Sequence, residues 1–451
     1  MALRFGTDGV RGRVDIDLRA ADVARLGACV AREWPQVPIV VGHDGRESGA
    51  SWLAAFATGA RSQGVVVHEV GLAPTPALAF LSAIRSCVAV SITASHNPYS
   101  DNGVKVFAPG GVKLSDDEQG RIERLWNAAG DVAPSHAVGN VALGTAAARE
   151  ATSAPTIAGP SIEEYVSHFA GVMTLNGQRV VIDCANGAMS QVAPRVLESL
   201  GLDVEVLSAA PNGRNINDHC GAVHPQPLAE RCAERGRIGL AFDGDGDRVI
   251  AVDERGNVVD GDRLIALAAL DLHRRGHLHD NTVAVTSMSN LGFHRAMREA
   301  GITVVTTDVG DRAVLSAMGE GNLSLGGEQS GHIIFSRHAT TGDGLLAGLV
   351  LLDLVQRSGE TLHALATNVM QSVPQILRNV RVARMPKNLD ELLGDELRSE
   401  RAALSDEGRI LVRASGTEPV VRVMVEAFSQ ERAEAVAERL VRLVETRTSV
   451  A

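Results

Sequence analysis

Short runs rich in Val and Ile recur along this chain, and each leads through a small or acidic loop into an amphipathic, Ala- and Leu-rich stretch. The clearest runs lie at 38–44, 180–183, 238–243 and 282–286. Such alternation of strand and helix is typical of parallel or mixed sheets whose strands are buried on both faces. The pattern predicts the α/β class, and its spread over distant parts of the chain favours repeated α/β domains over one large sheet.

Two changes of composition divide the 451 residues. Ala, Gly, Pro and Thr dominate 127–160, which indicates a linker, and a second break spans 359–374, after an apolar helix candidate at 344–355. The last unit ends in a predicted strand at 420–426 and an amphipathic helix at 430–446. At roughly 100 to 200 residues per domain, each domain can bury its own core. We expect four domains, at 1–157, 158–255, 256–368 and 376–451.

Composition excludes several classes of function. A net charge of −11 and only 3% aromatic residues disfavour an extended nucleic-acid surface and base stacking. The five cysteines include no C-x-x-C pair, which argues against a disulfide framework or a structural zinc site and for a reducing compartment. No apolar signal core and no membrane-spanning run is visible. We therefore expect a cytoplasmic protein that binds small molecules, phosphorylated ones included, but neither nucleic acid nor membrane.

An acidic loop follows the run at 238–242. Asp243, Asp245 and Asp247 alternate with glycines, so their carboxylates can converge on one hard divalent cation, and Mg²⁺ is the first candidate. The aspartates match three ligand positions of an EF-hand loop, but Arg248 stands where that loop requires glycine. An aspartyl phosphatase of the haloacid dehalogenase type also fails, because Asp247 occupies the place of its Thr or Val. A solvated acidic turn is disfavoured, since close like charges need a cation to offset them.

A second loop, at 94–105, follows a predicted buried strand at 88–93. Loops at the carboxyl ends of such strands carry ligands in α/β proteins. Ser95 could act there as a nucleophile, with His96 and Lys105 for proton transfer and charge neutralisation. The alternative is an ordinary Asn-Pro and Asn-Gly turn that contains a serine. A hydrolase serine is disfavoured, because the loop lacks a G-x-S-x-G elbow.

Glycines flank a polar turn ahead of the apolar run at 333–335. Glu328, Ser330 and His332 offer a carboxylate, a hydroxyl and an imidazole, a mixture that suits sugar hydroxyls. A satisfied turn with a core histidine explains the same residues equally well.

Near the C-terminus, two arginines flank a small turn. Arg413 and Arg422 lie on either side of Ser415-Gly416-Thr417, whose backbone N–H groups can form an anion nest. This pattern predicts a phosphate site. The alternative is a surface turn with two solvated arginines.

Five motifs, taken in order, resemble those of the α-D-phosphohexomutase superfamily. They are FGTDGVRG (5–12), ITASHNPYSDNGVK (92–105), FDGDGDR (242–248), GEQSGH (327–332) and RASGTEP (413–419). The resemblance runs from residue 5 to about residue 427 and implies a four-domain phosphohexomutase architecture. Three similar mixed-sheet α/β domains and a smaller C-terminal α+β domain would then each give one loop to a central cleft.

The resemblance also implies roles for the candidate residues. Ser95 would be the phosphoserine, and one Mg²⁺ would be held by a Ser95 phosphate oxygen with Asp243, Asp245 and Asp247. The expected catalytic residues are Ser95, Lys105, Arg11, His96 and Arg248. The expected substrate-binding residues are Glu328, Ser330, His332, Arg312, Arg413, Ser415, Gly416, Thr417 and Arg422.

The implied activity is that of an isomerase that moves a phosphoryl group between two oxygens of a hexose phosphate. A hexose 1,6-bisphosphate would be activator and intermediate, and it would turn end for end while the C-terminal domain opens at a hinge near 359–376. The first expected substrate is glucosamine 6-phosphate, converted to glucosamine 1-phosphate for amino-sugar nucleotide and cell-wall precursor synthesis. Glucose or mannose phosphate is the alternative, and the resemblance also suggests a homodimer. A non-catalytic sugar-phosphate-binding protein is disfavoured, because Ser95 and all three aspartates are present.

Overall fold

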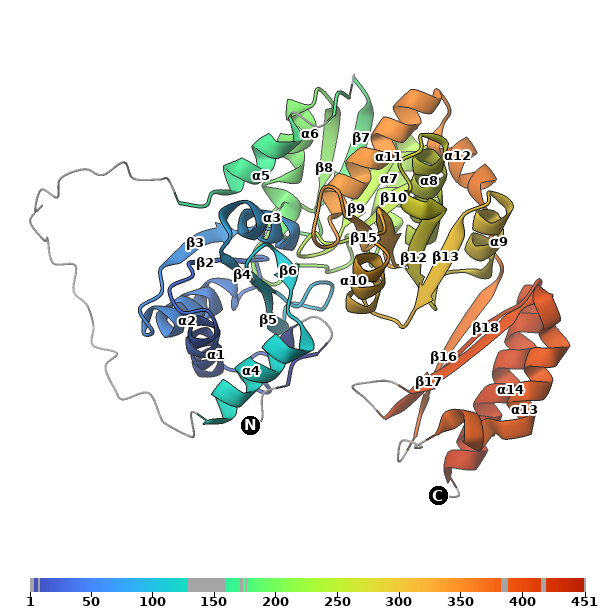
Figure 1. Cartoon of the computed structure of the whole chain (residues 1–451). Helices are drawn as coiled ribbons and strands as arrows, with labels where there is room; N and C mark the ends of the chain where they lie inside the picture. Colours follow the sequence, from blue (N-terminus) through green and yellow to red (C-terminus); the bar gives the residue numbers. More distant parts are fainter. Residues whose placement is uncertain are drawn as a thin grey trace, which may run out of the picture.

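Four sheets, each built from its own stretch of the chain, make up the molecule (Figure 1). The computed structural model describes residues 4–6, 9–128, 159–170, 173–175, 177–382, 388–414 and 419–449. Most of the predicted linker at 127–160, and the predicted phosphate-site residues Ser415, Gly416 and Thr417, fall outside this part of the chain. None of the helices described is both long and apolar enough to cross a lipid bilayer.

The first unit is a mixed six-stranded sheet between helices. Its strands run in the order β1-β5-β4-β2-β3, with β6 paired to β5; β2 is parallel to β3 and β4, whereas β5 is antiparallel to β4. Because helices cover both faces, every residue of β4 is buried, which explains why it is apolar except for Ser91. The elements are β1 (Val10–Arg13), α1 (Ala20–Glu33), β2 (Ile39–His43), α2 (Gly49–Arg61), β3 (Val67–Leu72), α3 (Thr75–Arg85), β4 (Val88–Ile92), β5 (Asp101–Ala108), β6 (Val112–Lys113) and α4 (Asp116–Ala128).

The second unit repeats this architecture with five strands, in the order β11-β10-β9-β7-β8. Strand β9 is parallel to β7 and antiparallel to β10, so the loop between β9 and β10 lies at the carboxyl edge of the parallel strands. The elements are α5 (Ile162–Phe169), β7 (Arg179–Asp183), η1 (Ala188–Ser190), α6 (Ala193–Ser199), β8 (Asp203–Leu207), α7 (Gln226–Arg235), β9 (Ile238–Phe242), β10 (Val249–Val252) and β11 (Val258–Val259).

The third unit has a four-stranded sheet in the order β13-β12-β14-β15. Its elements are α8 (Gly261–Arg274), η2 (His279–Asn281), β12 (Thr282–Thr286), α9 (Leu291–Glu299), β13 (Thr303–Thr307), α10 (Asp311–Glu320), β14 (Leu325–Gly327), β15 (Ile333–Phe335), α11 (Gly344–Ser358) and α12 (Leu362–Val369). One continuous apolar core extends through the second and third units, so these two do not bury separate cores as expected. Helix α11 explains the difference, because it is apolar around most of its circumference and packs against strands of both sheets.

The fourth unit is an antiparallel sheet, β16-β18-β17, with two helices on one face and its own core. It comprises β16 (Gln375–Arg381), α13 (Leu389–Leu404), η3 (Ser405–Glu407), β17 (Arg409–Ala414), β18 (Val420–Glu426) and α14 (Gln430–Ser449). Figure 1 shows it at the far end of the molecule from the first unit. Three mixed α/β sheets followed by a small antiparallel sheet confirm the predicted fold class.

Two local predictions differ from the structure. Lys105 lies inside strand β5, so the serine loop ends at residue 100 rather than 105. The predicted hinge at 359–376 contains helix α12, which packs on α8, so only 370–374 lies without regular structure between α12 and β16. A composition break marks a change of domain, but it does not exclude a short helix that reaches across it.

Candidate active site

Ser95 lies in the turn between β4 and β5, and its own backbone is unusual. Its φ of 54° is left-handed, a conformation that few residues other than glycine adopt. The Ser95 amide donates a hydrogen bond to Thr93 Oγ1 at 2.8 Å. Its hydroxyl donates to Asp243 Oδ2 at 2.7 Å, and the side chain is fully buried. The serine of the first unit is therefore fixed against the acidic loop of the second.

Asp243, Asp245 and Asp247, the aspartate triplet, converge as predicted. One carboxylate oxygen from each lies within 4.8 Å of the other two, and all three side chains are buried. Burial raises the pKa of Asp243 well above its usual value, and the charges of Asp247 and Asp245 raise it further. Within the described residues, Oδ1 of Asp245 and Oδ1 of Asp247 are buried without a hydrogen bond. Buried, convergent oxygens with open valences fit a hard divalent cation such as Mg²⁺.

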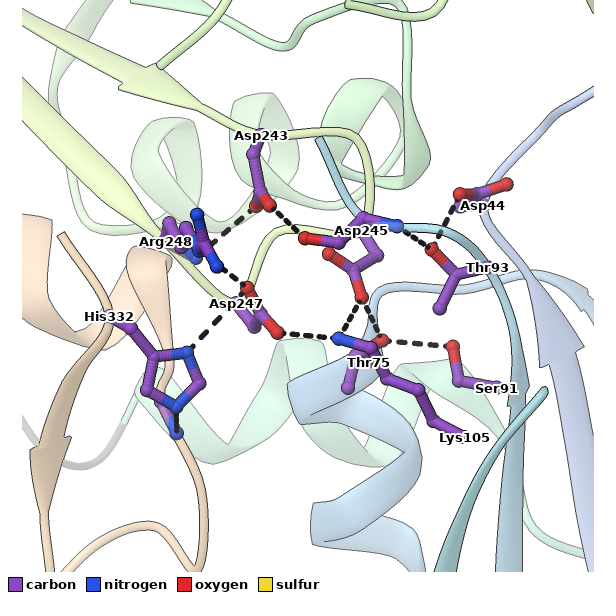
Figure 2. A network of polar contacts seen from close by, with 12 residues as sticks. Asp44, Thr75, Ser91, Thr93, Lys105, Asp243, Asp245, Asp247, Arg248 and His332 are labelled. Carbon is purple, nitrogen blue, oxygen red and sulfur yellow. Dashed lines mark hydrogen bonds and ion pairs between the residues drawn. The ribbon is translucent and has the colours of Figure 1, made fainter. Parts of the chain in front are cut away.

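A lysine, an arginine and a histidine surround the triplet (Figure 2). Lys105 Nζ donates to Asp245 Oδ2 at 2.8 Å and to Asp247 Oδ2 at 2.7 Å. Arg248 Nε and His332 Nδ1 lie 3.7 and 3.6 Å from Asp247 Oδ1. Burial alone would raise the pKa of Asp247, but Lys105 and His332 hold it well below its usual value. We call Ser95, Lys105, Arg248 and the aspartate triplet the Ser95 cluster.

Thr75, the first residue of α3, supports the cluster from the first unit. Its hydroxyl donates to Asp245 Oδ2 at 2.7 Å and also lies 2.8 Å from Ser91 Oγ. Its amide donates to the carbonyl oxygen of Asp245 at 2.9 Å. Sequence reasoning missed this residue, although its position at the start of a helix, just after a strand, was a usable signal.

A clamp formed by Asp44, Arg46 and Asn217 holds the backbone of the serine turn, and it was also missed. Arg46 donates from Nε to Asp44 Oδ2 at 2.8 Å and from Nη2 to the Ser95 carbonyl at 2.7 Å. Asp44 Oδ2 also accepts from Thr93 Oγ1 at 2.6 Å. Asn217 Nδ2 reaches the same Ser95 carbonyl from the second unit at 2.9 Å. The left-handed turn is therefore held by side chains from two domains.

His96 and Arg11 lie near this cluster. Burial, together with the charges of Arg248 and Arg11, lowers the pKa of His96 to about 4, so the ring is neutral at pH 7. Its Nδ1 is buried and makes no hydrogen bond to a described residue. Arg11 lies in β1, opposite Gly103 of the neighbouring strand β5.

The predicted sugar-binding residues are spread over several environments. Glu328 is half-buried, and its Oε1 accepts a hydrogen bond from the Gly310 amide at 3.1 Å; Ser330 is exposed. His332 is buried, with Nε2 accepting from the Gly342 amide at 3.1 Å, so it contacts Asp247 rather than open solvent. Arg312 turns toward helix α4, where it pairs with Asp116 at 2.5 Å.

Arg413 and Arg422 lie directly opposite each other on β17 and β18. Burial lowers the pKa of Arg413, and the charge of Arg422 lowers it further. Nε of Arg422 is buried and has no hydrogen-bond partner among the described residues. Two facing guanidinium groups with an open donor fit an anion. The sheet that carries them lies away from strands β4 and β9, which lead into the serine turn and the acidic loop (Figure 1).

The fold and these sites define a phosphohexomutase, and family models match the chain in the same order. They are the Phosphoglucomutase/phosphomannomutase models for alpha/beta/alpha domain I (residues 2–132), domain II (163–256), domain III (260–373) and the C-terminal domain (377–443). The chain belongs to this family, and it is an isomerase of the phosphotransferase type.

Individual proteins are similar to this chain over its whole length. The chain is 46% identical over 462 residues to the phosphoglucosamine mutase of Thermobifida fusca, covering 100% of both chains. It is also 46% identical over 468 residues to that of Kineococcus radiotolerans, again over 100% of both.

Solved structures share the fold. A phosphoglucomutase/phosphomannomutase family protein from Burkholderia thailandensis superposes with a TM-score of 0.77 at 24% identity, over 99% of this chain and 98% of that one. An N-acetylphosphoglucosamine mutase from Aspergillus fumigatus, in complex with GlcNAc-6P and magnesium, gives 0.66 at 19% identity, over 99% and 96%.

Proposed function

We propose that this protein interconverts glucosamine 6-phosphate and glucosamine 1-phosphate through phospho-Ser95 and a glucosamine 1,6-bisphosphate intermediate. The observation that carries the proposal is the 2.7 Å contact between the Ser95 hydroxyl and Asp243 inside a buried carboxylate triplet. A serine held at a cation site is placed to carry a phosphoryl group, and the relatives that are 46% identical over the whole chain are phosphoglucosamine mutases.

The charges of the Ser95 cluster suit phosphoryl transfer. A phosphoserine brings about −1.5 to −2 of charge into a buried site that already holds three carboxylates. Lys105 and Arg248 offset part of that charge, and Arg11 is expected to contribute as well. One Mg²⁺, held by the aspartate triplet and a Ser95 phosphate oxygen, would neutralise the rest and stabilise the moving phosphoryl group. Positioning and electrostatics then supply most of the catalysis.

Besides suitable charges, phosphoryl transfer requires Ser95 to be held in a fixed position. The clamp fixes the serine carbonyl from two directions, and Thr75 fixes the acidic loop against the same sheet. A small displacement of a nucleophile costs a large part of the rate, so these residues act as positioning residues. We propose the same part for His332, which is buried against Asp247.

The facing arginines of the fourth unit would hold the phosphate that does not react. Arg413 and Arg422, with Ser415, Gly416 and Thr417, would bind it while Glu328 and Ser330 contact sugar hydroxyls. Because Figure 1 shows this sheet apart from strands β4 and β9, the fourth unit would close over bound substrate by bending at 370–374. Closure excludes the water that would otherwise hydrolyse the phosphoserine.

The test is a comparison of kcat/KM for glucosamine 1-phosphate, glucose 1-phosphate and mannose 1-phosphate, with Mg²⁺ and a trace of hexose 1,6-bisphosphate. We expect the amino sugar to be preferred by more than about a hundredfold, or about 2.7 kcal/mol of transition-state discrimination. Preference for a neutral hexose phosphate would retain the mechanism and overturn the substrate.

A further inference from the structure

A cavity of about 210 Å³ lies where the first three units meet. Its walls are α3 of the first unit, α5 of the second, and the segment 336–343 with the start of α11 from the third. None of the residues that line it belongs to the Ser95 cluster, the predicted sugar-binding set or the facing arginines. The established chemistry therefore leaves it unused.

Aromatic rings form one side of this cavity. Phe80 and Tyr165 meet edge to face with ring centroids 5.7 Å apart, and Tyr165 and Phe169 do so at 5.0 Å. The imidazole of His168 packs 4.8 Å from Phe80. Aromatic residues make up only 3% of the chain, so this grouping is a local concentration. Tyr165 and Phe169 are almost fully buried, so the half-buried ring of Phe80 is the aromatic surface on which a flat apolar body can pack.

One arginine supplies the positive charge at the mouth of the cavity, because burial lowers the pKa of both neighbouring histidines, His168 and His338. Arg337 and His338 are exposed at it, and His168 is half-buried beside them. Within the described chain, Arg337 makes neither a hydrogen bond nor an ion pair. Asp343 is the carboxyl among the lining residues, and it is buried and engaged by the Tyr165 hydroxyl at 2.8 Å. In a protein whose net charge is −11, a solvent-exposed arginine of this kind favours an anion at the mouth of the cavity.

Two walls of the cavity begin at the metal loop. Helix α3 starts at Thr75, whose amide and hydroxyl both bond to Asp245. Helix α11 starts at Gly344, whose amide donates to the Gly246 carbonyl at 3.1 Å. A ligand that enters between the first turns of these helices presses on both anchors of the acidic loop. Occupancy of the cavity is thereby coupled to the geometry of the aspartate triplet.

We propose that this cavity is an effector site for a small aromatic anion, a single ring that carries one phosphate or carboxylate group, and that its occupancy changes the affinity of the triplet for Mg²⁺. The ring packs against Phe80, and the anionic group pairs with Arg337. The volume of about 210 Å³ accepts one ring and excludes drug-sized molecules.

The binding test uses phenyl phosphate as probe, with the full chain in the Arg422→Ala background so that the phosphate site of the fourth unit does not contribute. Isothermal titration should give one site in the millimolar range or tighter. Inorganic phosphate, which lacks the ring, and benzyl alcohol, which lacks the charge, should each bind at least tenfold more weakly. Benzoate in place of phenyl phosphate tells whether the site prefers a carboxylate.

Two variants locate the site. Arg337→Ala should weaken phenyl phosphate at least tenfold, and Ala79→Phe, which fills the cavity from α3, should abolish binding. Arg255→Ala, an exposed arginine outside the cavity, should change nothing. Ala79→Phe can perturb the packing of α3. Arg337→Ala changes an exposed side chain, so we expect that variant to fold and to keep the test valid. Absence of phenyl phosphate binding, or unchanged binding in Arg337→Ala, overturns the site.

The coupling test measures Mg²⁺ affinity with and without saturating phenyl phosphate. We expect at least a threefold shift, and linkage requires Mg²⁺ to change the phenyl phosphate affinity by the same factor. An unchanged Mg²⁺ affinity overturns the effector role. Neither measurement uses turnover, so failure here is distinguishable from failure of the proposed mutase activity.

Discussion

Oδ1 of Asp245 and Oδ1 of Asp247 are the two oxygens that the Ser95 cluster leaves without a hydrogen bond among described residues. The other oxygen of each carboxylate is committed to Lys105. One lysine therefore orients two aspartates, so that Oδ1 of Asp245 stays open to a cation while Oδ1 of Asp247 faces Arg248 and His332 at 3.7 and 3.6 Å. The Ser95 hydroxyl, bonded to Asp243, completes the arrangement.

Ser95→Ala removes the hydroxyl that carries the phosphoryl group in this account. We expect kcat for the mutase reaction to fall by more than about a thousandfold, because covalent transfer has no replacement nucleophile in the turn. Ser100→Ala, an exposed serine of the same loop, should keep the parent rate. Steady-state kinetics of the two purified variants decide the matter, and a Ser95→Ala enzyme at the parent rate would remove Ser95 from the mechanism.

Asn217→Asp replaces a donor to the Ser95 carbonyl with a carboxylate that repels it. We expect kcat to fall at least tenfold while KM for the sugar phosphate stays within about twofold, because the serine turn shifts but the phosphate site does not. Asn212→Asp is the matched control, since the side-chain oxygen of Asn212 only accepts hydrogen bonds from backbone amides and a carboxylate can do the same. Equal kcat values for the two variants would show that the Asn217 contact does not position Ser95.

Sequence reasoning selected every residue of the Ser95 cluster, and the structure brings them together, while their catalytic roles stay predictions. Motifs at the ends of strands made that selection possible. The clamp residues Arg46 and Asn217 were missed, because they reach Ser95 across 49 and 122 residues of chain and belong to no local pattern. Contacts between domains of this kind follow from how the sheets pack, which a single sequence does not reveal.

At the scale of elements, β17 and β18 set the spacing of two arginines. Directly opposed residues of an antiparallel pair project on the same face, so Arg413 and Arg422 lie side by side. Their mutual repulsion contributes to the lowered pKa of Arg413. An anion would relieve this repulsion, and the substrate phosphate is the anion that we propose.

Arg422→Ala removes one of these guanidinium groups. We expect the apparent KM for glucosamine 1-phosphate to rise at least tenfold with a smaller change in kcat, since the lost contact is to the phosphate that does not react. Arg378→Ala removes an arginine from β16 of the same sheet, on the opposite face, and should leave KM unchanged. A KM unaffected by Arg422→Ala would contradict the phosphate site.

Asp262, in the first turn of α8, makes the stability of the protein depend on pH. Burial, together with the charges of Asp260 and Glu426, raises its pKa to about 7. The folded protein thus holds a proton that the unfolded chain releases near pH 4, so stability falls as pH rises toward 7. Asp262→Asn keeps an acceptor for the Asn290 amide but carries no charge. We expect the Tm of Asp262→Asn to exceed that of the parent by an amount that increases between pH 5 and 8.

The control for this prediction is Asp280→Asn, which changes an exposed carboxylate. Its Tm difference from the parent should stay flat across the same range. Thermal melts at several pH values make the measurement, and a flat difference for Asp262→Asn as well would show that Asp262 does not titrate near neutrality.

Over the whole molecule, two connections decide how the units move. The second and third units share one apolar core, so they behave as one block. The fourth has its own core and meets the third through Glu426, whose Oε2 accepts from Arg409 at 2.9 Å and whose Oε1 accepts from the Leu291 amide at 3.1 Å. The segment 370–374 and this buried network are where bending for closure would occur.

Strand-and-helix periodicity was enough to predict the class and the number of domains, because the central strands, such as β4 and β9, are buried along their whole length and read as apolar runs. It did not predict the core shared by the second and third units, since the partners of an all-round apolar helix such as α11 are set by packing and not by its own sequence. The residue numbers at which domains meet, the homodimer and the cytoplasmic location stay predictions.

The proposed mutase reaction requires Ser95 to be phosphorylated. The direct measurement is peptide mass spectrometry of the protein after incubation with glucose 1,6-bisphosphate and Mg²⁺, followed by addition of glucosamine 1-phosphate. We predict one phosphate on the peptide that contains Ser95, and its loss with formation of glucosamine 1,6-bisphosphate when the amino sugar phosphate is added. Phosphate on another residue, or an unmodified Ser95 in an enzyme that turns over, would contradict the account.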